Sequence, residues 1–258
     1  MMNSSRKWLV LFFVGGLALA CSSKTELTHQ PMGERASVQY QFAFDFFRGG
    51  DIVRARSAAL TAAELAPQDA DVRNLLGLIY FRRGEYEQAE REFKLASQLN
   101  PRMSEAHNNL GTLYYDLQRY EEALEALDRA LDNPLYLNPE RVHNNRGLVF
   151  EAMGQHDKAR EEYDRAIFLR PSYHLPYQNL GRMLVTLGVH AEARDFLERA
   201  VVLCDECLEP RYHLGMALLE TNHREEAIRL FKEAHEMNPR SYFGQLAGER
   251  LEREGIAR

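Results

Sequence analysis

Several residue types that mark particular classes of protein are scarce in this sequence. Only 3 Cys and 9 Pro occur among 258 residues, which excludes a disulfide-dense scaffold and a collagen-like or proline-rich chain. Positive charge is not in excess either, because 32 Lys and Arg face 38 Asp and Glu for a formal net charge of -6. Proteins that bind nucleic acids need a basic surface, so we expect no nucleic-acid partner. The 45% share of hydrophobic residues indicates a folded chain.

Motifs that carry catalysis are also missing. The nine His include no H-E-x-x-H pair, and the sequence has no G-x-S-x-G, no P-loop and no dinucleotide fingerprint. We therefore predict a protein that is not an enzyme and that uses no cofactor, metal ion or small-molecule substrate.

A long apolar run occurs only at the N-terminus. Residues 1–20 carry two cations, Arg6 and Lys7, and then an uncharged run from Trp8 to Ala20, which is the layout of a secretory signal peptide. The run is shorter than the about 20 residues that a membrane-spanning helix needs. Cleavage is therefore favoured over retention as a membrane anchor.

The end of this run, Leu17-Ala18-Leu19-Ala20-Cys21, resembles the lipobox of bacterial lipoproteins. The resemblance implies cleavage before Cys21 and covalent diacylglyceryl and N-acyl groups on that residue. Because Ser22 and not Asp follows, it also implies the periplasmic face of the outer membrane. The alternative is an ordinary signal peptide with a chance Cys. Residues 21–35, polar and without helical periodicity, are expected to form the lipidated Cys and a flexible tether.

From Ala36 onward the sequence repeats itself. A Gly recurs every 34 or 36 residues, followed 12 residues later by an Ala and seven residues after that by another, as in Gly77, Ala89 and Ala96. Small residues at this spacing let two antiparallel helices approach closely. A degenerate first copy has Ala43 in place of the Gly. The register gives six repeats, at residues 36–69, 70–103, 104–139, 140–173, 174–207 and 208–241.

These units resemble tetratricopeptide repeats (TPRs). The second repeat matches the family pattern at Leu76, Gly77, Tyr80, Ala89, Phe93, Ala96 and Pro101. The resemblance implies an all-α fold, a right-handed TPR solenoid of six helix-turn-helix repeats. Residues 242–258 are amphipathic and predict a C-terminal capping helix. Two residues are extra in the third repeat, and Arg146 replaces a Leu, so its guanidinium must reach solvent or a carboxylate.

Cys204 and Cys207 form a C-x-x-C at the junction of the fifth and sixth repeats. In a secreted protein such a pair favours a structural disulfide. A redox-active pair is disfavoured because Asp205 and Glu206 between the two Cys would raise the thiol pKa. A zinc site would need two further ligands, and no second C-x-x-C or matching His pair is apparent.

The family geometry implies that function lies in the groove lined by the first helix of each repeat. Positions five, nine and twelve of those helices predict a partner-binding groove formed by Tyr40, Phe44, Phe47, Asn74, Leu78, Phe81, Asn108, Thr112, Tyr115, Asn144, Leu148, Arg182, Val185, Tyr212, Met216 and Leu219. Apolar residues dominate positions nine and twelve, and the amides at position five could pair with an extended peptide backbone. We expect an apolar polypeptide ligand. The alternative is that some of these residues pack internally or bind the tether.

A lipobox, a short tether and six TPRs together resemble the TPR-type pilotins of type IV pilus systems, the Tgl, PilF and PilW group. The resemblance implies a lipid-anchored outer-membrane protein whose partners are secretin subunits, and which promotes their membrane insertion and multimerisation. One alternative is an outer-membrane TPR adaptor that scaffolds peptidoglycan enzymes or another envelope complex. Another is a periplasmic thiol-disulfide enzyme that uses Cys204 and Cys207.

Overall fold

The described part of the chain is all helical. The computed structural model describes residues 33–256, so the predicted signal peptide and Cys21 lie outside the described residues. The described residues contain no strand and form α1 Glu34–Arg48, α2 Ile52–Leu65, α3 Ala70–Arg82, α4 Tyr86–Leu99, α5 Ser104–Asp116, α6 Tyr120–Leu131, α7 Pro139–Ala152, α8 His156–Leu169, α9 His174–Thr186, α10 His190–Leu203, α11 Leu208–Glu220, α12 Arg224–Met237 and α13 Tyr242–Arg253. None of these helices is long and apolar enough to cross a membrane.

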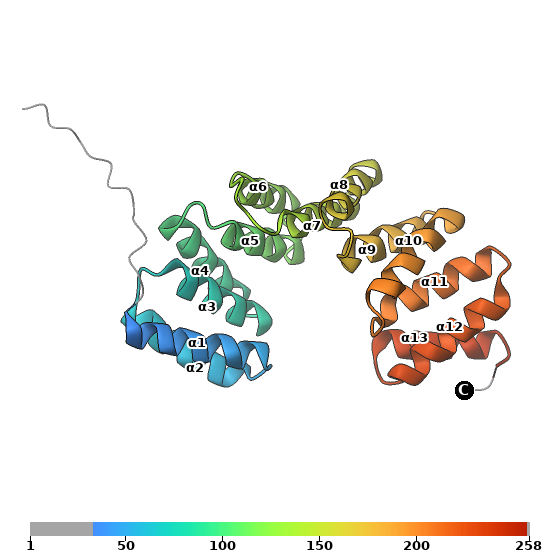
Figure 1. Ribbon diagram of the computed structural model, residues 1–258, viewed down its shortest axis with the longest axis horizontal. Helices are drawn as coiled ribbons and strands as arrows, with labels where there is room; N and C mark the ends of the chain where they lie inside the picture. Colours follow the sequence, from blue (N-terminus) through green and yellow to red (C-terminus); the bar gives the residue numbers. More distant parts are fainter. Residues whose placement is uncertain (1–32, 257–258) are drawn as a thin grey trace, which may run out of the picture.

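The helices stack as six successive pairs into an arch, with α1 and α2 at one end and α13 at the other (Figure 1). In each pair the first helix packs against the second, and the second packs against the first helix of the next pair. Helices α5 and α9 lie on the inner side of the arch, and α6 and α8 lie on its outer side (Figure 1). The six predicted helix-turn-helix units and the solenoid architecture are confirmed.

Close packing within each pair depends on the repeated Gly. A Cβ atom at Gly111 would lie 2.5 Å from Cγ of Leu127, and one at Gly215 would lie 2.6 Å from Cε1 of Phe231. A side chain at either position would therefore collide with the bulky residue that the second helix of the pair places there.

The turn inside each repeat needs a residue in the left-handed backbone conformation. Gly84 supplies it with a φ of 75°, and Asn222 supplies it in the last repeat with a φ of 64°.

The hydrophobic core divides at the fourth repeat. One large cluster of buried side chains extends as far as Val149, and a second begins at Ala159. In the same repeat, Arg146 forms ion pairs with Glu162, at 3.0 Å, and with Asp128. The expectation that this guanidinium finds carboxylates is confirmed. A charged network thus replaces the apolar contact that Leu makes at the same position of other repeats.

The structure shifts some predicted boundaries. Helix α1 begins at Glu34, so the last two residues of the predicted tether belong to the first helix. The two extra residues of the third repeat fall near a seven-residue connection, 132–138, where the other repeats use four, as in 100–103. Helix α13 packs against α11 and α12, as a capping helix should, and ends at Arg253, before the predicted limit of 258.

Candidate peptide-binding groove

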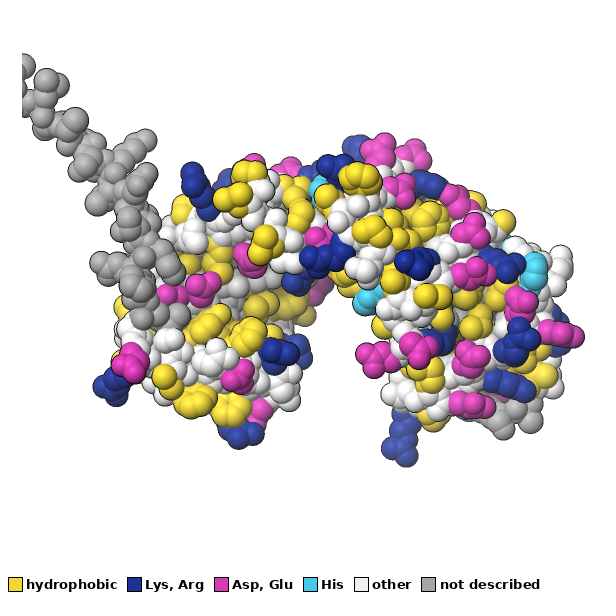
Figure 2. All heavy atoms as spheres, viewed as in Figure 1, with side chains coloured by type: hydrophobic (Ala, Val, Ile, Leu, Met, Phe, Trp, Pro, Cys, Tyr) yellow, Lys and Arg dark blue, Asp and Glu magenta, His cyan; other side chains and the backbone are white. Residues whose placement is uncertain are grey.

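A row of half-buried apolar side chains follows the inner helices from α1 to α11. Their apolar surfaces pack partly on the two hydrophobic clusters and partly face outward. The row consists of Tyr40, Phe44, Phe47, Leu78, Phe81, Tyr115, Leu148, Val185, Tyr212, Met216 and Leu219. Figure 2 shows the hollow between the two ends of the arch, with hydrophobic side chains reaching its walls. The predicted apolar positions are thus accessible, although each is anchored in the core.

The N-terminal half of this row is aromatic. The ring of Tyr40 stacks on that of Phe44 with their centroids 6.4 Å apart. The guanidinium of Arg48 lies over Phe44, and that of Arg82 lies 5.0 Å from the centroid of Phe47. Contacts of a cation with a ring face hold both side chains in place. These rings form an apolar wall at the N-terminal end of the arch.

The asparagines of the predicted site do not face a ligand. Asn74, Asn108 and Asn144 are buried, with exposed fractions of 9%, 3% and 2%. Each accepts a hydrogen bond at 2.9 Å from the amide of an Asn on the next inner helix, the donors being Asn109, Asn145 and Asn179 in turn. The prediction that they bind a peptide backbone is wrong, because a buried amide must be satisfied within the protein. They form an asparagine ladder that joins α3, α5, α7 and α9.

Thr112 belongs to the same network. Its hydroxyl donates to the carbonyl oxygen of Asn108 at 3.1 Å and accepts from the Asn145 amide at 3.2 Å. The Thr112 hydroxyl therefore has both of its partners inside the protein, and the prediction that it binds a ligand is also wrong.

Arg182 is not a free cation in the groove. Its guanidinium donates to both carboxylate oxygens of Glu151, at 2.8 and 3.0 Å, and lies 3.7 Å from an oxygen of Glu209. The Tyr163 hydroxyl also donates to Glu151, at 2.8 Å. Burial opposes the charge of Arg182, yet the Glu151 carboxylate holds the pKa of the guanidinium above its ordinary value. The assignment of Arg182 to partner binding is corrected to an internal role.

This ion pair divides the apolar row in the middle of the arch. Glu151 occupies position twelve of the fourth repeat, where Phe81 and Tyr115 stand in the two preceding repeats. The part of the row before the ion pair is mostly aromatic and ends at Leu148, and the C-terminal part runs from Val185 to Leu219. The acidic residue at an otherwise apolar position is the sequence signal that could have located this break.

A histidine is built into the C-terminal part of the row. The ring of His213 meets those of Tyr212 and Phe243 edge-on, with centroids 5.4 and 5.7 Å away. Burial, reinforced by the charge of Arg182, lowers the pKa of the His213 imidazole to about 4. The ring is therefore neutral near pH 7 and acts as part of an aromatic cluster.

Models of the tetratricopeptide repeat match residues 40–97, 108–174 and 144–206, and further ones match 69–135 and 208–241. The matches span most of the chain. The chain belongs to the tetratricopeptide repeat family. No curated protein matches it in sequence.

Solved TPR structures share its fold at low sequence identity. The Pseudomonas aeruginosa PilF structure has a TM-score of 0.71 and 22% identity over 83% of this chain and 96% of that one. PilW, described as a widely conserved type IV pilus biogenesis factor, has a TM-score of 0.74 and 20% identity over 83% of this chain and 98% of that one. The Cut9–Hcn1 complex of APC/C gives 0.73 and 18%, with only 42% of that chain covered. These identities establish the fold alone.

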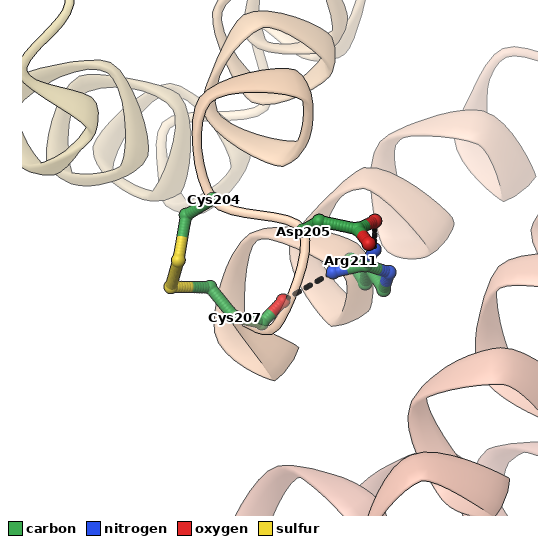
Figure 3. Close-up of a disulfide and its surroundings, with 4 residues drawn as sticks. All are labelled: Cys204, Asp205, Cys207 and Arg211. Atoms are coloured by element: carbon green, nitrogen blue, oxygen red, sulfur yellow. Dashed lines mark hydrogen bonds and ion pairs between the residues drawn. A yellow bond between two sulfur atoms is a disulfide. The ribbon is translucent and has the colours of Figure 1, made fainter.

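The C-x-x-C of this TPR chain forms a disulfide at a helix junction. Cys204 follows the last residue of α10 and Cys207 precedes the first residue of α11. Figure 3 shows Asp205 turned away from the sulfur atoms toward Arg211, whose guanidinium lies 2.6 Å from the carboxylate. The same guanidinium donates to the Cys207 carbonyl oxygen at 2.9 Å. Asp205, one of the two acidic residues expected to raise the thiol pKa, is thus paired with Arg211.

Proposed function

We propose that the protein is a lipid-anchored outer-membrane assembly factor of the pilotin type, whose groove binds an apolar polypeptide segment of a type IV pilus secretin. By holding that segment, it would promote membrane insertion and multimerisation of the secretin subunits. The single observation that carries the proposal is the row of accessible apolar side chains along the inner helices. A surface of this kind is typical of a binding site for a partner.

The structure sharpens the expected ligand. Because the asparagines are occupied by one another, recognition rests on burial of apolar side chains and not on pairing with a peptide backbone. The Glu151–Arg182 pair interrupts the row, so the ligand should carry two apolar stretches separated by a polar one.

Two resemblances support the biological setting. Nearly the full lengths of PilF and PilW superpose on this chain, so its extent agrees with those proteins of type IV pilus biogenesis. The lipobox ending in Cys21 supplies an anchor. Acyl chains contribute about 0.8 kcal/mol per buried CH₂, and several chains hold a protein stably on a membrane. The twelve residues from Ser22 to Gly33 would span at most about 40 Å when extended.

The proposal is tested by following secretin multimers in cells that lack the protein. We expect the heat-resistant multimer band to be lost on a gel run without heat denaturation, and to return when the wild-type chain is supplied. Full levels of multimer in the deletion strain would refute the pilotin role. Affinity purification from membranes then identifies the partner, since recovery of a peptidoglycan hydrolase without secretin would indicate the adaptor alternative.

The role of the groove is tested separately with matched substitutions. Phe81→Glu and Leu148→Glu place a charge in the row and should reproduce the deletion. Phe168→Glu is the control, because Phe168 is 73% exposed on the outer helix α8. Each variant must keep its helical circular dichroism signal. Wild-type multimer levels in both folded groove variants would show that the groove is not the binding surface.

A further inference from the structure

The junction of the fifth and sixth repeats holds a cluster of side chains that the proposed function does not use. Ligand atoms of His174, Cys204 and Cys207 all lie within 4.8 Å of one another. Among the described residues, no other group of three His, Cys, Asp or Glu side chains converges in this way. The sequence pattern does not point to His174 as a ligand, because this residue lies 30 residues before Cys204.

From this convergence we propose that the reduced form of the protein binds a thiophilic metal ion, Zn²⁺ or a similar d¹⁰ cation, through His174, Cys204 and Cys207. The disulfide is then the metal-free state of the same site. The site is independent of the groove and of the proposed pilotin role.

The backbone already holds the three ligands near the required geometry. Zinc binds sulfur at about 2.3 Å and imidazole nitrogen at about 2.0–2.1 Å, so tetrahedral ligands are about 3.5–3.8 Å apart. The Cα atoms of Cys204 and Cys207 are 5.4 Å apart. Once the sulfur–sulfur bond of about 2 Å is broken, side-chain rotations must move the two sulfur atoms about 2 Å further apart and bring the imidazole about 1 Å closer. Three protein ligands leave a fourth position for solvent.

The local charges suit thiolate ligands. Cys207 stands at the N-terminal end of α11, where the helix dipole stabilises an anion. Asp205, the nearest carboxylate in sequence, points toward the buried Arg211 and is paired with it at 2.6 Å (Figure 3). Glu206 is exposed to solvent. Of the two acidic residues between the Cys, one is therefore paired with a cation, and the other faces solvent, which screens its charge.

In the fourth repeat, the side chains at the equivalent two positions are in direct contact. Its residues equivalent to His174 and Cys204 are Glu140 and Arg170, 34 positions earlier in each case. Their side chains form an ion pair at 2.6 Å. In the fifth repeat the same contact brings an imidazole to a cysteine pair. A metal ion there would join the ends of three helices, α9, α10 and α11.

The chemistry balances with a dithiol reductant. The reductant transfers two electrons and two protons to the disulfide, which gives two thiols, and its own two thiols become a disulfide. Binding of M²⁺ then displaces the two thiol protons, and the neutral imidazole of His174 donates its lone pair. A disulfide oxidant reverses the step: the two thiolates pass two electrons to it, re-form the sulfur–sulfur bond and release M²⁺, while the oxidant takes up two protons and becomes a dithiol.

The test uses the full chain in detergent. Cys21 is replaced in it by Cys21→Ser, so that Cys204 and Cys207 are the only Cys left. The protein is reduced anaerobically with a phosphine, its helical circular dichroism is recorded, and Zn²⁺ is titrated by calorimetry. We expect one ion per chain for the reduced protein and no binding by the oxidised one. Co²⁺ in place of Zn²⁺ should give a thiolate charge-transfer band. Absence of binding by the reduced protein, or loss of its helical signal, would overturn the proposal.

Variants separate the three-ligand site from a simple dithiol. Loss of one ligand should weaken Zn²⁺ binding by at least about tenfold, the scale of effect seen for changes around metal sites. His174→Ala is the decisive variant, with His190→Ala as control, because His190 is likewise the first residue of its helix. Cys204→Ser should abolish both binding and the Co²⁺ band. Wild-type affinity in His174→Ala would exclude His174 as a ligand and refute the site.

Discussion

The side-chain amide of Asn179 donates a hydrogen bond to the side-chain oxygen of Asn144 at 2.9 Å, between two inner helices whose residues here are buried. The bond joins the fourth and fifth repeats at the point where the hydrophobic core divides. Equivalent bonds at Asn74 and Asn108 continue the ladder toward the N-terminus. Polar contacts thus hold the repeats in register where apolar packing is interrupted.

Loss of one partner of this pair should destabilise the solenoid. Asn179→Leu leaves the Asn144 oxygen without its donor, and a buried unsatisfied group costs about 1–3 kcal/mol. Urea unfolding followed by circular dichroism measures the change against Gln98→Leu, an exposed control. The double variant Asn144→Leu, Asn179→Leu should lose less than the sum of the two single variants. Strict additivity would show that the two amides do not interact.

A methyl group at the repeat glycine should be destabilising despite its helix propensity. At Gly111 the added Cβ would lie 2.5 Å from Leu127 Cγ and 3.3 Å from the Ala123 carbonyl oxygen. Overpacking costs about 1–3 kcal/mol, and Ala gains about 1 kcal/mol over Gly in a helix, so Gly111→Ala should lower stability by up to about 2 kcal/mol. Gly33→Ala is the control, because nothing lies within 4 Å of its Cβ. A stability gain at Gly111 would contradict the close packing.

Acidification should weaken the C-terminal repeats through His213. Its imidazole titrates near pH 6.5 when unfolded and near pH 4 when folded. The unfolded state therefore binds more protons between these values, and stability falls as pH is lowered from about 6.5 to about 4, with no further change from this group below. Urea midpoints at several pH values measure the slope. His213→Leu should flatten it, whereas the exposed His223→Gln should leave it unchanged; an unaltered slope in His213→Leu would assign the effect to other groups.

Removal of the Arg182 guanidinium at the centre of the arch should lower the stability of the fold, because this cation is part of an internal ion pair. Arg182→Ala leaves Glu151, whose side chain is 16% exposed, with only the Tyr163 hydroxyl. Breaking a buried pair costs about 3–5 kcal/mol, and partial exposure reduces this to about 1–3 kcal/mol here. Arg182→Lys should lose less, because it keeps the charge but not both hydrogen bonds. Urea unfolding measures both, with the exposed Arg199→Ala as control; a neutral Arg182→Ala would mean that the pair contributes nothing.

The sequence by itself determined the architecture. The pattern of Gly77, Ala89 and Ala96 recurs with a period of 34 or 36 residues. It is local, and local patterns decide which residues are helical and which helix pairs with its neighbour. The capping helix and the need of Arg146 for a carboxylate followed from the same reasoning, because each departs from a repeated pattern at a known position. The row of half-buried apolar side chains along the inner helices was also located by register alone.

Only the tertiary structure decided what the polar residues do. Asn144 meets Asn179 across 35 residues, Glu151 meets Arg182 across 31, and His174 meets the Cys204–Cys207 pair from the start of the same repeat. Each partner is chosen by the pitch at which successive repeats stack. That pitch arises from packing between helices and leaves no local mark in the sequence. The repeat register therefore places a polar side chain on an inner helix. The residue opposite it on the next repeat then decides whether that side chain faces a ligand or the protein itself.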